Sequence, residues 1–308
     1  MTTVDVRRST PLVVPRADRP RTGPSVLLAL PALVFFAVFA LVPLGGVVVL
    51  SLMRWNGLDT PTWTGLTNWT HTLSDPGTRG ALWLTVKVMA LTWIVQTPIS
   101  LLLGVFTAGT QRYRAVLAVL YFLPLLLSSA AVAIAFKSLL DPNFGVSRAF
   151  NLQALSQDYL GDSRLVLYVV VFAIAWQFVP FHSLLYQAGV RQIPASLYEA
   201  ASIDGAGRVT QFRFITLPQL RNTIVTSSTL MLIGALTYFD LIFVLTGGGP
   251  GDATRVLSLD MYLTGFSAND MGTASALAVL LVLAGLLLSW GITKATGFSQ
   301  MRSELEGA

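Results

Sequence analysis

The sequence has no cysteine among its 308 residues and only two histidines, His71 and His182. The absence of cysteine excludes disulfides, thiolate metal sites and cysteine nucleophiles together. The two histidines lie far apart, and no group of His, Asp and Glu has the spacing of metal ligands. We expect His71 to be a solvated loop residue and His182 to be packed and hydrogen-bonded. No catalytic set is visible, so the chain is not expected to be an enzyme.

Charge is also scarce, because 11% of the residues are charged, against roughly 25% in an average soluble domain. Apolar residues take up the difference and make 54% of the chain hydrophobic. Runs of about 18 or more apolar residues indicate membrane helices. Six such runs predict an all-α polytopic membrane protein with spans at about 26–52, 81–108, 115–137, 165–190, 222–245 and 272–293.

Five prolines fall inside or near these spans and predict kinked helices: Pro31, Pro43, Pro98, Pro124 and Pro180. A kinked bundle can enclose a cavity, or the kinks can serve packing alone. The sequence leaves both interpretations open.

Three regions follow from this pattern: a basic tail at 1–24, a membrane domain at 25–295 and a short tail at 296–308. The first tail holds five arginines among Pro, Thr and Asp, which is typical of disorder. The predicted spans place thirteen basic residues on one side of the membrane and six on the other. Basic residues concentrate on the cytoplasmic side, so both tails and residues 194–218 are expected there.

Residues 194–218 form the one long amphipathic stretch between two strongly apolar blocks. Pro194 suits a first helical turn, and Ser196 with Glu199 has the spacing of a capping box. Gly205 and Gly207 are expected to break that helix, since glycine adopts left-handed backbone angles without penalty. A second helix is expected from about Arg208 to Phe214, ending before Pro218. A bent pair of short helices of this kind is suited to docking.

The spacing of this stretch resembles the EAA loop of ABC-importer permeases. It has Glu199-Ala200-Ala201, then Gly205 after three residues, Ile215 after nine more, and Leu217-Pro218. Asp204-Gly205-Ala206 and Phe212 resemble the carbohydrate-uptake branch, whose type member is the maltose permease. The resemblance implies a coupling helix that contacts an ATPase through Glu199, Ala200, Ala201, Asp204, Gly205, Ile215, Leu217 and Pro218.

Two further segments resemble the larger permease of sugar importers: Leu245-Thr246-Gly247-Gly248-Gly249-Pro250 and Gly65-Leu66-Thr67-Asn68-Trp69. The first is not a phosphate-binding P-loop, because it lacks the Gly-Lys-Ser/Thr ending; a turn or gating loop on the outer side fits better. The resemblance implies a six-helix type I permease bundle in a bacterial inner (plasma) membrane. The implied partners are a second, similar permease, two copies of a cytoplasmic ABC ATPase that binds ATP and Mg²⁺, and an extracytoplasmic solute-binding protein. No cofactor is expected in this chain.

Two helical faces are candidates for a solute path, because their residues recur at i, i+3, i+4 and i+7. The fourth span offers Ile174, Gln177, Phe178 and Phe181, and the fifth offers Met231, Gly234, Ala235 and Tyr238. Sugars need both the hydrogen-bonding groups and the flat apolar surface that these faces supply. The same small residues are also typical of close helix packing. The resemblance implies that these positions line a sugar pocket, apart from Ile174.

Other transport classes remain as alternatives. A permease for glycerol-phosphate or another small solute would carry the same EAA spacing. An ion-coupled secondary transporter would need ionisable residues near mid-membrane. The spans carry chiefly Lys87, Lys137 and Asp240, and the last two lie near predicted span ends. Ion coupling is therefore the weaker alternative.

Overall fold

The computed structural model describes residues 28–109, 111–151 and 156–296. The basic tail predicted at 1–24 and nearly all of the tail at 296–308 lie outside these residues. The chain divides into two compact units, residues 1–46 and 47–308. The first unit and the start of the second share one apolar helix, Leu30–Leu50. It comprises α1 (Leu30–Phe36), the π-helical turn η2 (Ala37–Leu41) and α2 (Val42–Leu50), none of which contains a buried residue.

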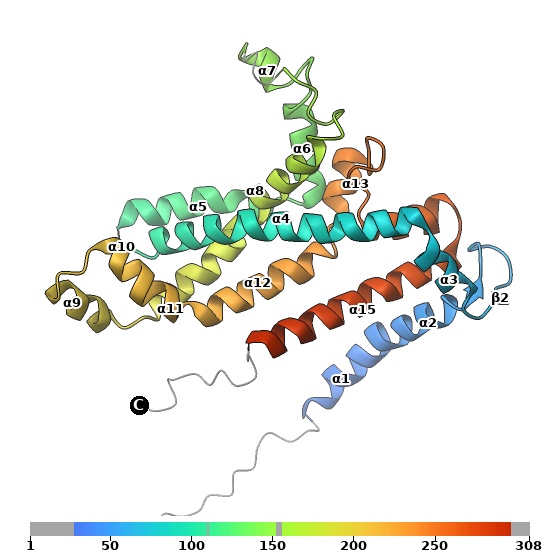
Figure 1. Cartoon of the computed structure of the whole chain (residues 1–308), viewed down its shortest axis with the longest axis horizontal. Coiled ribbons are helices and arrows are strands. Elements are labelled where there is room, and N and C mark those ends of the chain that lie inside the picture. Colours follow the sequence, from blue (N-terminus) through green and yellow to red (C-terminus); the bar gives the residue numbers. More distant parts are fainter. Residues whose placement is uncertain (1–27, 110, 152–155, 297–308) are drawn as a thin grey trace, which may run out of the picture. The chain divides into compact units, whose positions relative to one another are not determined.

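Three more helices are long and apolar enough to cross a membrane. They are α4 (Pro76–Thr107), α8 (Val166–Arg191) and α15 (Met271–Thr296). The carboxylate of Asp75 caps the first of these by accepting the Thr78 N–H at 2.7 Å. Within the second unit α4 and α8 pack along each other (Figure 1). Pro98 and Pro180 lie inside these two helices, which continue through them.

Two further spans are bent pairs of helices rather than single helices. The predicted span 115–137 is α5 (Arg112–Leu126) followed by α6 (Ser129–Leu139), with a bend of 97°. The predicted span 222–245 is α12 (Arg221–Ala235) followed by α13 (Asp240–Thr246), with a bend of 50°. If each pair is counted as one span, the described residues hold six candidate spans, the number predicted; counted without the pairs, they hold four. The first bend follows Pro124. Ser128 is the N-cap residue of α6, and its hydroxyl accepts the Ala131 N–H at 3.2 Å.

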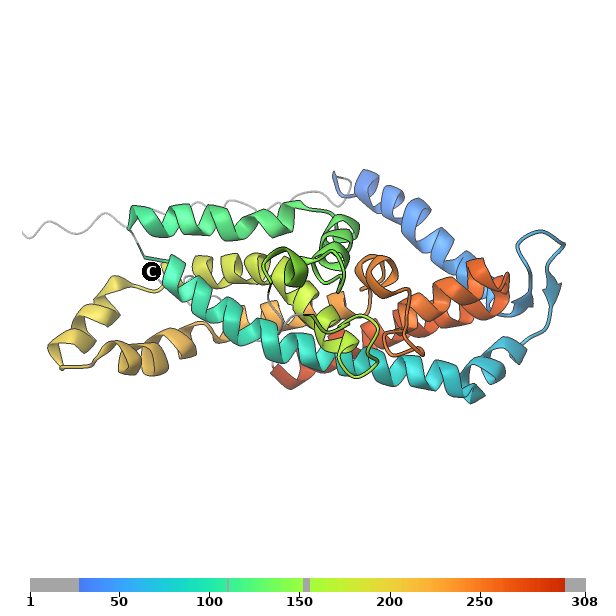
Figure 2. The ribbon, with the colours of Figure 1, turned by 90° about the horizontal axis from the view of Figure 1, so that it is seen from above.

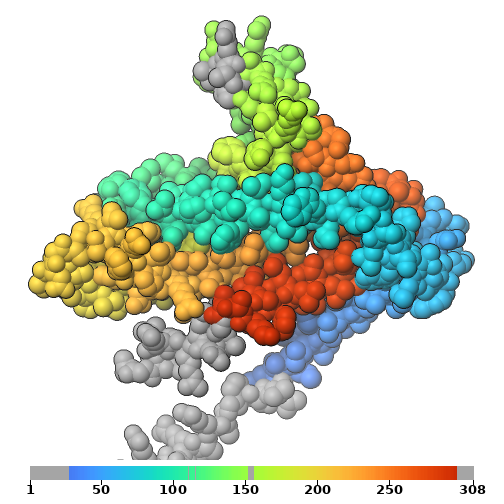
Figure 3. Space-filling model, in the orientation of Figure 1, coloured from blue at the N-terminus to red at the C-terminus, as the bar shows by residue number. Residues whose placement is uncertain are grey.

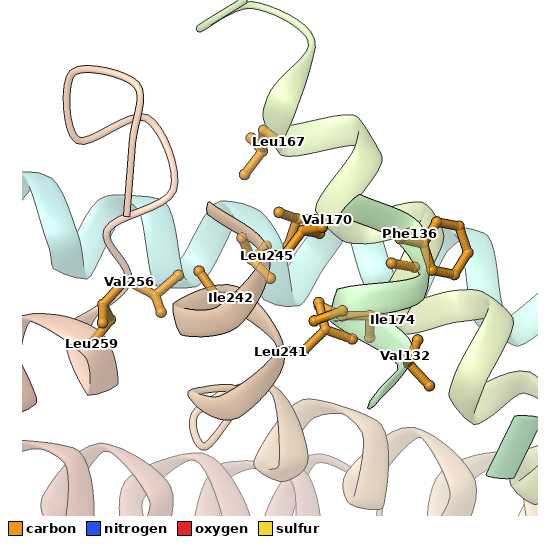
Figure 4. Close-up of a cluster of buried hydrophobic side chains, with 13 residues drawn as sticks. Val132, Phe136, Leu167, Val170, Ile174, Leu241, Ile242, Leu245, Val256 and Leu259 are labelled. Carbon is orange, nitrogen blue, oxygen red and sulfur yellow. The ribbon is translucent and has the colours of Figure 1, made fainter. Parts of the chain in front are cut away.

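The largest apolar core of the second unit lies where α6, α8 and α13 meet (Figure 4). Ile174 and Ile242 are completely buried in it, together with Val132 and Val170. Tyr238 and Phe239, at the break between α12 and α13, pack against the same core. No proline lies at this break, so no proline in the sequence marks it.

Shorter elements connect the helices. After α2 come β1 (Met53–Arg54) and β2 (Thr62–Trp63), which pair antiparallel, and then α3 (Thr67–Ser74). The all-α prediction did not include this strand pair. Asn68 holds the turn before β1 by donating to the carbonyls of Ser51 and Met53 at 2.9 and 2.8 Å. The remaining elements are α7 (Val146–Ala149), α9 (Ala195–Ile203), α10 (Arg208–Gln211), η4 (Phe212–Thr216), α11 (Leu217–Gln219), α14 (Leu257–Tyr262) and η5 (Leu263–Ser267).

Within the second unit, the elements between α8 and α12 lie together at one end of α4, and α3 lies at the other end of that helix (Figures 1 and 2). Close approach of α4 and α8 near the first end depends on Gly104. A Cβ at Gly104 would lie 2.6 Å from the Cβ of Tyr186 and 2.7 Å from the carbonyl oxygen of Ser183. Small residues permit such contact between membrane helices.

Candidate docking loop and solute path

The candidate docking loop, residues 194–218, is a bent helical segment as predicted, but its first helix starts differently. Pro194 is the N-cap residue of α9, and no side chain caps the helix. Ser196 therefore lies inside the first turn, where its hydroxyl cannot serve as the cap of a capping box. The predicted Ser196–Glu199 capping box is wrong, and both side chains are exposed.

Only one of the two glycines breaks the loop in the predicted way. Gly205 has φ +78°, and the Ala206 N–H donates to the Ala201 carbonyl at 2.8 Å across it. This is the backbone arrangement that a left-handed residue makes after a helix. Gly207 instead has φ −70° and ψ 167°, extended angles of an N-cap residue that any amino acid adopts.

The second helix of the loop does not end at Phe214 as predicted. It continues through η4 into α11, so Pro218 lies inside the helical segment rather than after it. Proline removes one N–H and its ring conflicts with a carbonyl one turn earlier. The π-helical turn over Phe212–Thr216 precedes the proline, and wider turns of this kind accommodate such a conflict. The helical path breaks at Leu220, which is buried.

Hydrogen bonds inside the loop hold its shape. The Tyr198 hydroxyl and Thr216 Oγ1 are 2.9 Å apart. Gln211 Nε2 donates to Ser202 Oγ and to the Ala206 carbonyl, each at 3.0 Å. These bonds join the two arms of the loop to each other.

Most of the residues predicted for ATPase docking are exposed in the structure. Glu199, Ala200, Asp204, Gly205, Leu217 and Pro218 are exposed, while Ala201 and Ile215 are half-buried. Neither Glu199 nor Asp204 forms an ion pair with another described residue. On the face seen in Figure 3, α9 and α10 form the tip of their end of the second unit.

Sequence reasoning missed three apolar residues on the same loop. Ile203 is 87% exposed, Val209 80% and Phe214 68%. Large apolar side chains that are this exposed mark a contact with another molecule when they gather on one segment. The sequence did offer a signal for them, because large apolar side chains are unexpected in a short stretch that is otherwise polar and charged.

The two candidate solute faces meet through a pair of aromatic rings. The rings of Phe178 and Tyr238 stack with centroids 5.6 Å apart. Gln177 turns toward the break between α5 and α6, where its Nε2 donates to the Leu127 carbonyl at 3.1 Å. Phe181 is partly exposed and lies edge-on to His182.

The fifth-span residues of the candidate path are mostly internal. Met231 is buried, and its sulfur accepts the Thr97 hydroxyl at 3.5 Å. Ala235 is also buried, whereas a Cβ at Gly234 would meet no atom within 4 Å. A cavity of about 860 Å³ lies between α4, α5 and α8, but its lining includes none of the seven predicted path residues.

Two polar features of the helices complete this region. His182 Nδ1 lies 3.0 Å from Ser227 Oγ, so the packed, hydrogen-bonded histidine is confirmed. Gln96 is fully buried, and neither end of its amide lies within hydrogen-bonding geometry of another described residue. A glutamine within an apolar span was the available signal, because buried polar residues in membrane helices are costly and tend to be functional. Gln96 was nevertheless missed.

At the opposite end of α4, a polar cavity of about 440 Å³ lies against the glycine-rich loop. Trp83 and Lys87 line it from α4, and Asp252 and Arg255 line it from the loop. Arg255 forms an ion pair with Asp260, with Nη2 and Oδ1 2.7 Å apart. The glycine-rich loop has a defined turn conformation. Three of its glycines, Gly247, Gly248 and Gly251, have positive φ, and Thr254 Oγ1 donates to the Gly249 carbonyl at 3.0 Å.

Comparison with known proteins gives one family. Residues 98–294 match the family described as the inner membrane component of binding-protein-dependent transport systems. A probable ABC transporter permease from Bacillus subtilis, YurN, is 33% identical over 270 residues, covering 85% of this chain and 92% of that protein. The trehalose/maltose transport system permease MalF of Thermococcus litoralis is 31% identical over 272 residues, covering 86% and 90%.

A solved structure has the same fold. A chain of a bacterial ABC transporter involved in the import of the acidic polysaccharide alginate superposes with a TM-score of 0.78 at 22% identity. The superposition covers 90% of this chain and 96% of that one. At this identity the likeness concerns the fold alone.

Proposed function

The chain belongs to the family of inner membrane components of binding-protein-dependent transport systems, and from this premise we propose that it forms part of the import pathway for a sugar or oligosaccharide. It is an integral, multi-pass membrane protein of a permease family, and such a permease is not itself an enzyme. The sugar assignment is supported by relatives whose names state trehalose/maltose and arabinooligosaccharide transport.

The observation that carries the proposal is the exposed loop 194–218 at one end of the bundle. A pathway protein without an energy source of its own needs a rigid surface on which an ATPase can act. The internal hydrogen bonds of the loop make it rigid, and its outward side offers Glu199 and Asp204 without ion-pair partners among the described residues. Glu199 would accept a charge-assisted contact from the ATPase, while Ala200, Ala201 and Gly205 would permit close approach.

The proposed assembly contains this chain, a second permease and two copies of a cytoplasmic ATPase. ATP and Mg²⁺ would bind to the ATPase, so this chain needs no cofactor. An extracytoplasmic binding protein would deliver the solute to the end of α4 that carries the glycine-rich loop. The distribution of basic residues supports this orientation, with both termini and the docking loop in the cytoplasm.

Uptake of labelled sugars by cells tests the proposal directly. Cells that lack this chain should lose uptake of one sugar or oligosaccharide, and the intact gene should restore it. Uptake of an unrelated solute, such as an amino acid, is the control. Normal uptake of every tested sugar by the deletion strain would contradict the proposed substrate class.

A further inference from the structure

A small cavity with two arginines lies at the inner side of the docking loop. It has a volume of about 290 Å³ and is formed where the end of α4, the start of α5 and the end of α8 meet α9, α10 and η4. Arg114 lines it from α5 and Arg208 from α10. None of the described residues that line this arginine cavity is acidic, so no carboxylate in the described part of the lining neutralises the two positive charges.

Arg114 is held in place by its neighbours. Its Nη1 donates to the Phe106 carbonyl at 2.7 Å, and its Nε donates to the Tyr113 hydroxyl at 3.2 Å. The guanidinium carbon lies 4.7 Å from the centroid of the Phe106 ring. Gly109 makes room for this position, because a Cβ there would collide with the guanidinium. A guanidinium has five N–H donors in a planar fork, so Arg114 keeps donors for a ligand.

Arg208 has no such anchors. Its side chain makes no hydrogen bond and no ion pair with another described residue. Two guanidinium groups at one cavity, one fixed and one unengaged, match an anion with several acceptor oxygens, since arginine pairs with phosphate through two parallel N–H···O bonds. The chemistry of the site is therefore that of a phosphate group.

The other walls of the cavity indicate where that phosphate comes from. Val105, Val190 and Phe212 form an apolar wall. The cavity also lies where the spans α4 and α8 end, at Thr107 and Arg191. A free phosphate ion would leave the apolar wall unused, whereas the first methylene groups of a phospholipid's acyl chains would cover it. Basic cavities between membrane helices at this depth bind lipid headgroups.

We propose that the arginine cavity binds the phosphate group of an anionic phospholipid. The lipid would contact α5 through Arg114 and α10 through Arg208, and so connect the membrane spans with the docking loop. This site lies outside both the docking residues and the candidate solute path, and it does not depend on the transported solute.

The test uses the full-length chain, purified in detergent and exchanged into mixed micelles of phosphatidylglycerol and phosphatidylcholine. Native mass spectrometry then measures the ratio of the two lipids that remain bound. The wild-type chain should retain phosphatidylglycerol preferentially. Arg114→Gln and Arg208→Gln should each reduce that preference about fivefold, because a basic residue near anionic lipid contributes about 1 kcal/mol.

Arg213→Gln is the matched control. Arg213 lies on the same loop, has its guanidinium 5.7 Å from the Phe214 ring and does not line the cavity. Its replacement removes the same charge and should leave the lipid preference unchanged. Arg208→Lys, which retains the charge, should keep most of the preference. If Arg213→Gln lowers the preference as much as Arg208→Gln, or if the wild-type chain shows none, the site does not exist.

Two further measurements separate a loss of lipid binding from misfolding and from binding of a soluble anion. Because the Arg208 side chain makes no hydrogen bond or ion pair with another described residue, Arg208→Gln should elute and unfold like the wild-type chain. Its lipid ratio remains interpretable even if Arg114→Gln fails to fold. Titration with inorganic phosphate separates the two sources of phosphate. Retention of phosphatidylglycerol in millimolar phosphate supports the lipid; its displacement there would assign the cavity to a soluble anion and overturn the proposal.

Discussion

The ring of Phe178 stacks on the ring of Tyr238 with an interplanar angle of 30°, and this contact joins the fourth span to the break in the fifth. Stacked aromatic rings are worth about 0.5–1.5 kcal/mol beyond the area that they bury. The pair thus stabilises the break between α12 and α13. It also places the Tyr238 hydroxyl and a flat apolar surface at the same point.

Tyr238→Ala and Gln177→Ala should lower sugar uptake or alter sugar preference if the pair borders the solute path. Losing one hydrogen bond or one stacking surface weakens occupancy by about 1–2 kcal/mol, roughly five- to thirtyfold. ATP hydrolysis stimulated by the binding protein should persist, because the docking loop is unchanged. Transport per reconstituted complex, measured with two sugars, checks this.

Tyr238→Phe is the matched variant, since it keeps the stacked ring and removes only the hydroxyl. A path role predicts a change of selectivity for Tyr238→Phe as well. If these residues only pack the helices, Tyr238→Ala should reduce the amount of assembled complex and leave the rate and selectivity per complex unchanged. That result would remove the proposed path from this chain.

The docking loop offers a test with two glycines in almost the same surroundings. A Cβ at Gly205 or at Gly207 would meet no atom within 4 Å, but Gly205 has φ +78° and Gly207 φ −70°. Gly205→Val should distort the loop, because a left-handed residue with a side chain costs about 1–2 kcal/mol or more when it is β-branched. Gly207→Val should be tolerated by the backbone.

We therefore expect Gly205→Val to abolish uptake and the stimulation of ATP hydrolysis, with the chain still present in the membrane. Glu199→Lys should have the same effect through charge reversal at the ATPase contact. ATP hydrolysis by complexes reconstituted with loaded binding protein measures both. Normal stimulation in Glu199→Lys would rule out its docking role.

The membrane spans could be predicted from the sequence because an apolar run of sufficient length is a local property. The breaks inside two of them could not. Pro124 lies at the first break, yet Pro98 and Pro180 are equally placed in spans and leave continuous helices. The second break has no proline, and the contacts that Tyr238 and Phe239 make with the core beside it join residues far apart in the sequence.

The docking loop shows the same limit at a smaller scale. Its position and its bend followed from residue spacing, but the roles of individual residues depended on the exact helix start. With Pro194 as the N-cap, Ser196 is displaced from the capping position that its sequence pattern suggests. The arginine cavity was beyond prediction, because only the tertiary arrangement brings Arg114 and Arg208, which are far apart in the sequence, to one cavity.

Reporter fusions should establish the orientation. Fusions after residues 112, 205 and 300 are expected to report the cytoplasm, and fusions near 65, 150 and 252 the outside. The excess of thirteen over six basic residues on the first side is the physical reason. Paired alkaline phosphatase and fluorescent-protein fusions at each position give opposite signals for the two sides. One inverted position would show that the count of spans is wrong.

The last prediction concerns the ion pair that holds the start of α14. Two nitrogens of Arg255 contact the same oxygen of Asp260, Oδ1. Nε donates to it at 2.8 Å, and Nη2 lies 2.7 Å from it. The Asp260 side chain is 6% exposed and that of Arg255 34%. Arg255→Gln would leave a buried carboxylate without its cation, and we expect it to destabilise the chain by about 2–3 kcal/mol.

Asp252→Asn is the control for this pair, because its contact with Arg255 is 3.5 Å long and its side chain is 74% exposed. Exposed pairs contribute about 0–1 kcal/mol, so Asp252→Asn should shift the melting temperature little. In the double variant Arg255→Gln/Asp260→Asn, the buried charge is removed along with its partner. Part of the lost stability should therefore return, as measured by thermal unfolding in detergent. If the double variant is less stable than Arg255→Gln, the loss in the single variant does not come from an uncompensated carboxylate but from other contacts of the Arg255 side chain, which lines the polar cavity beside the glycine-rich loop.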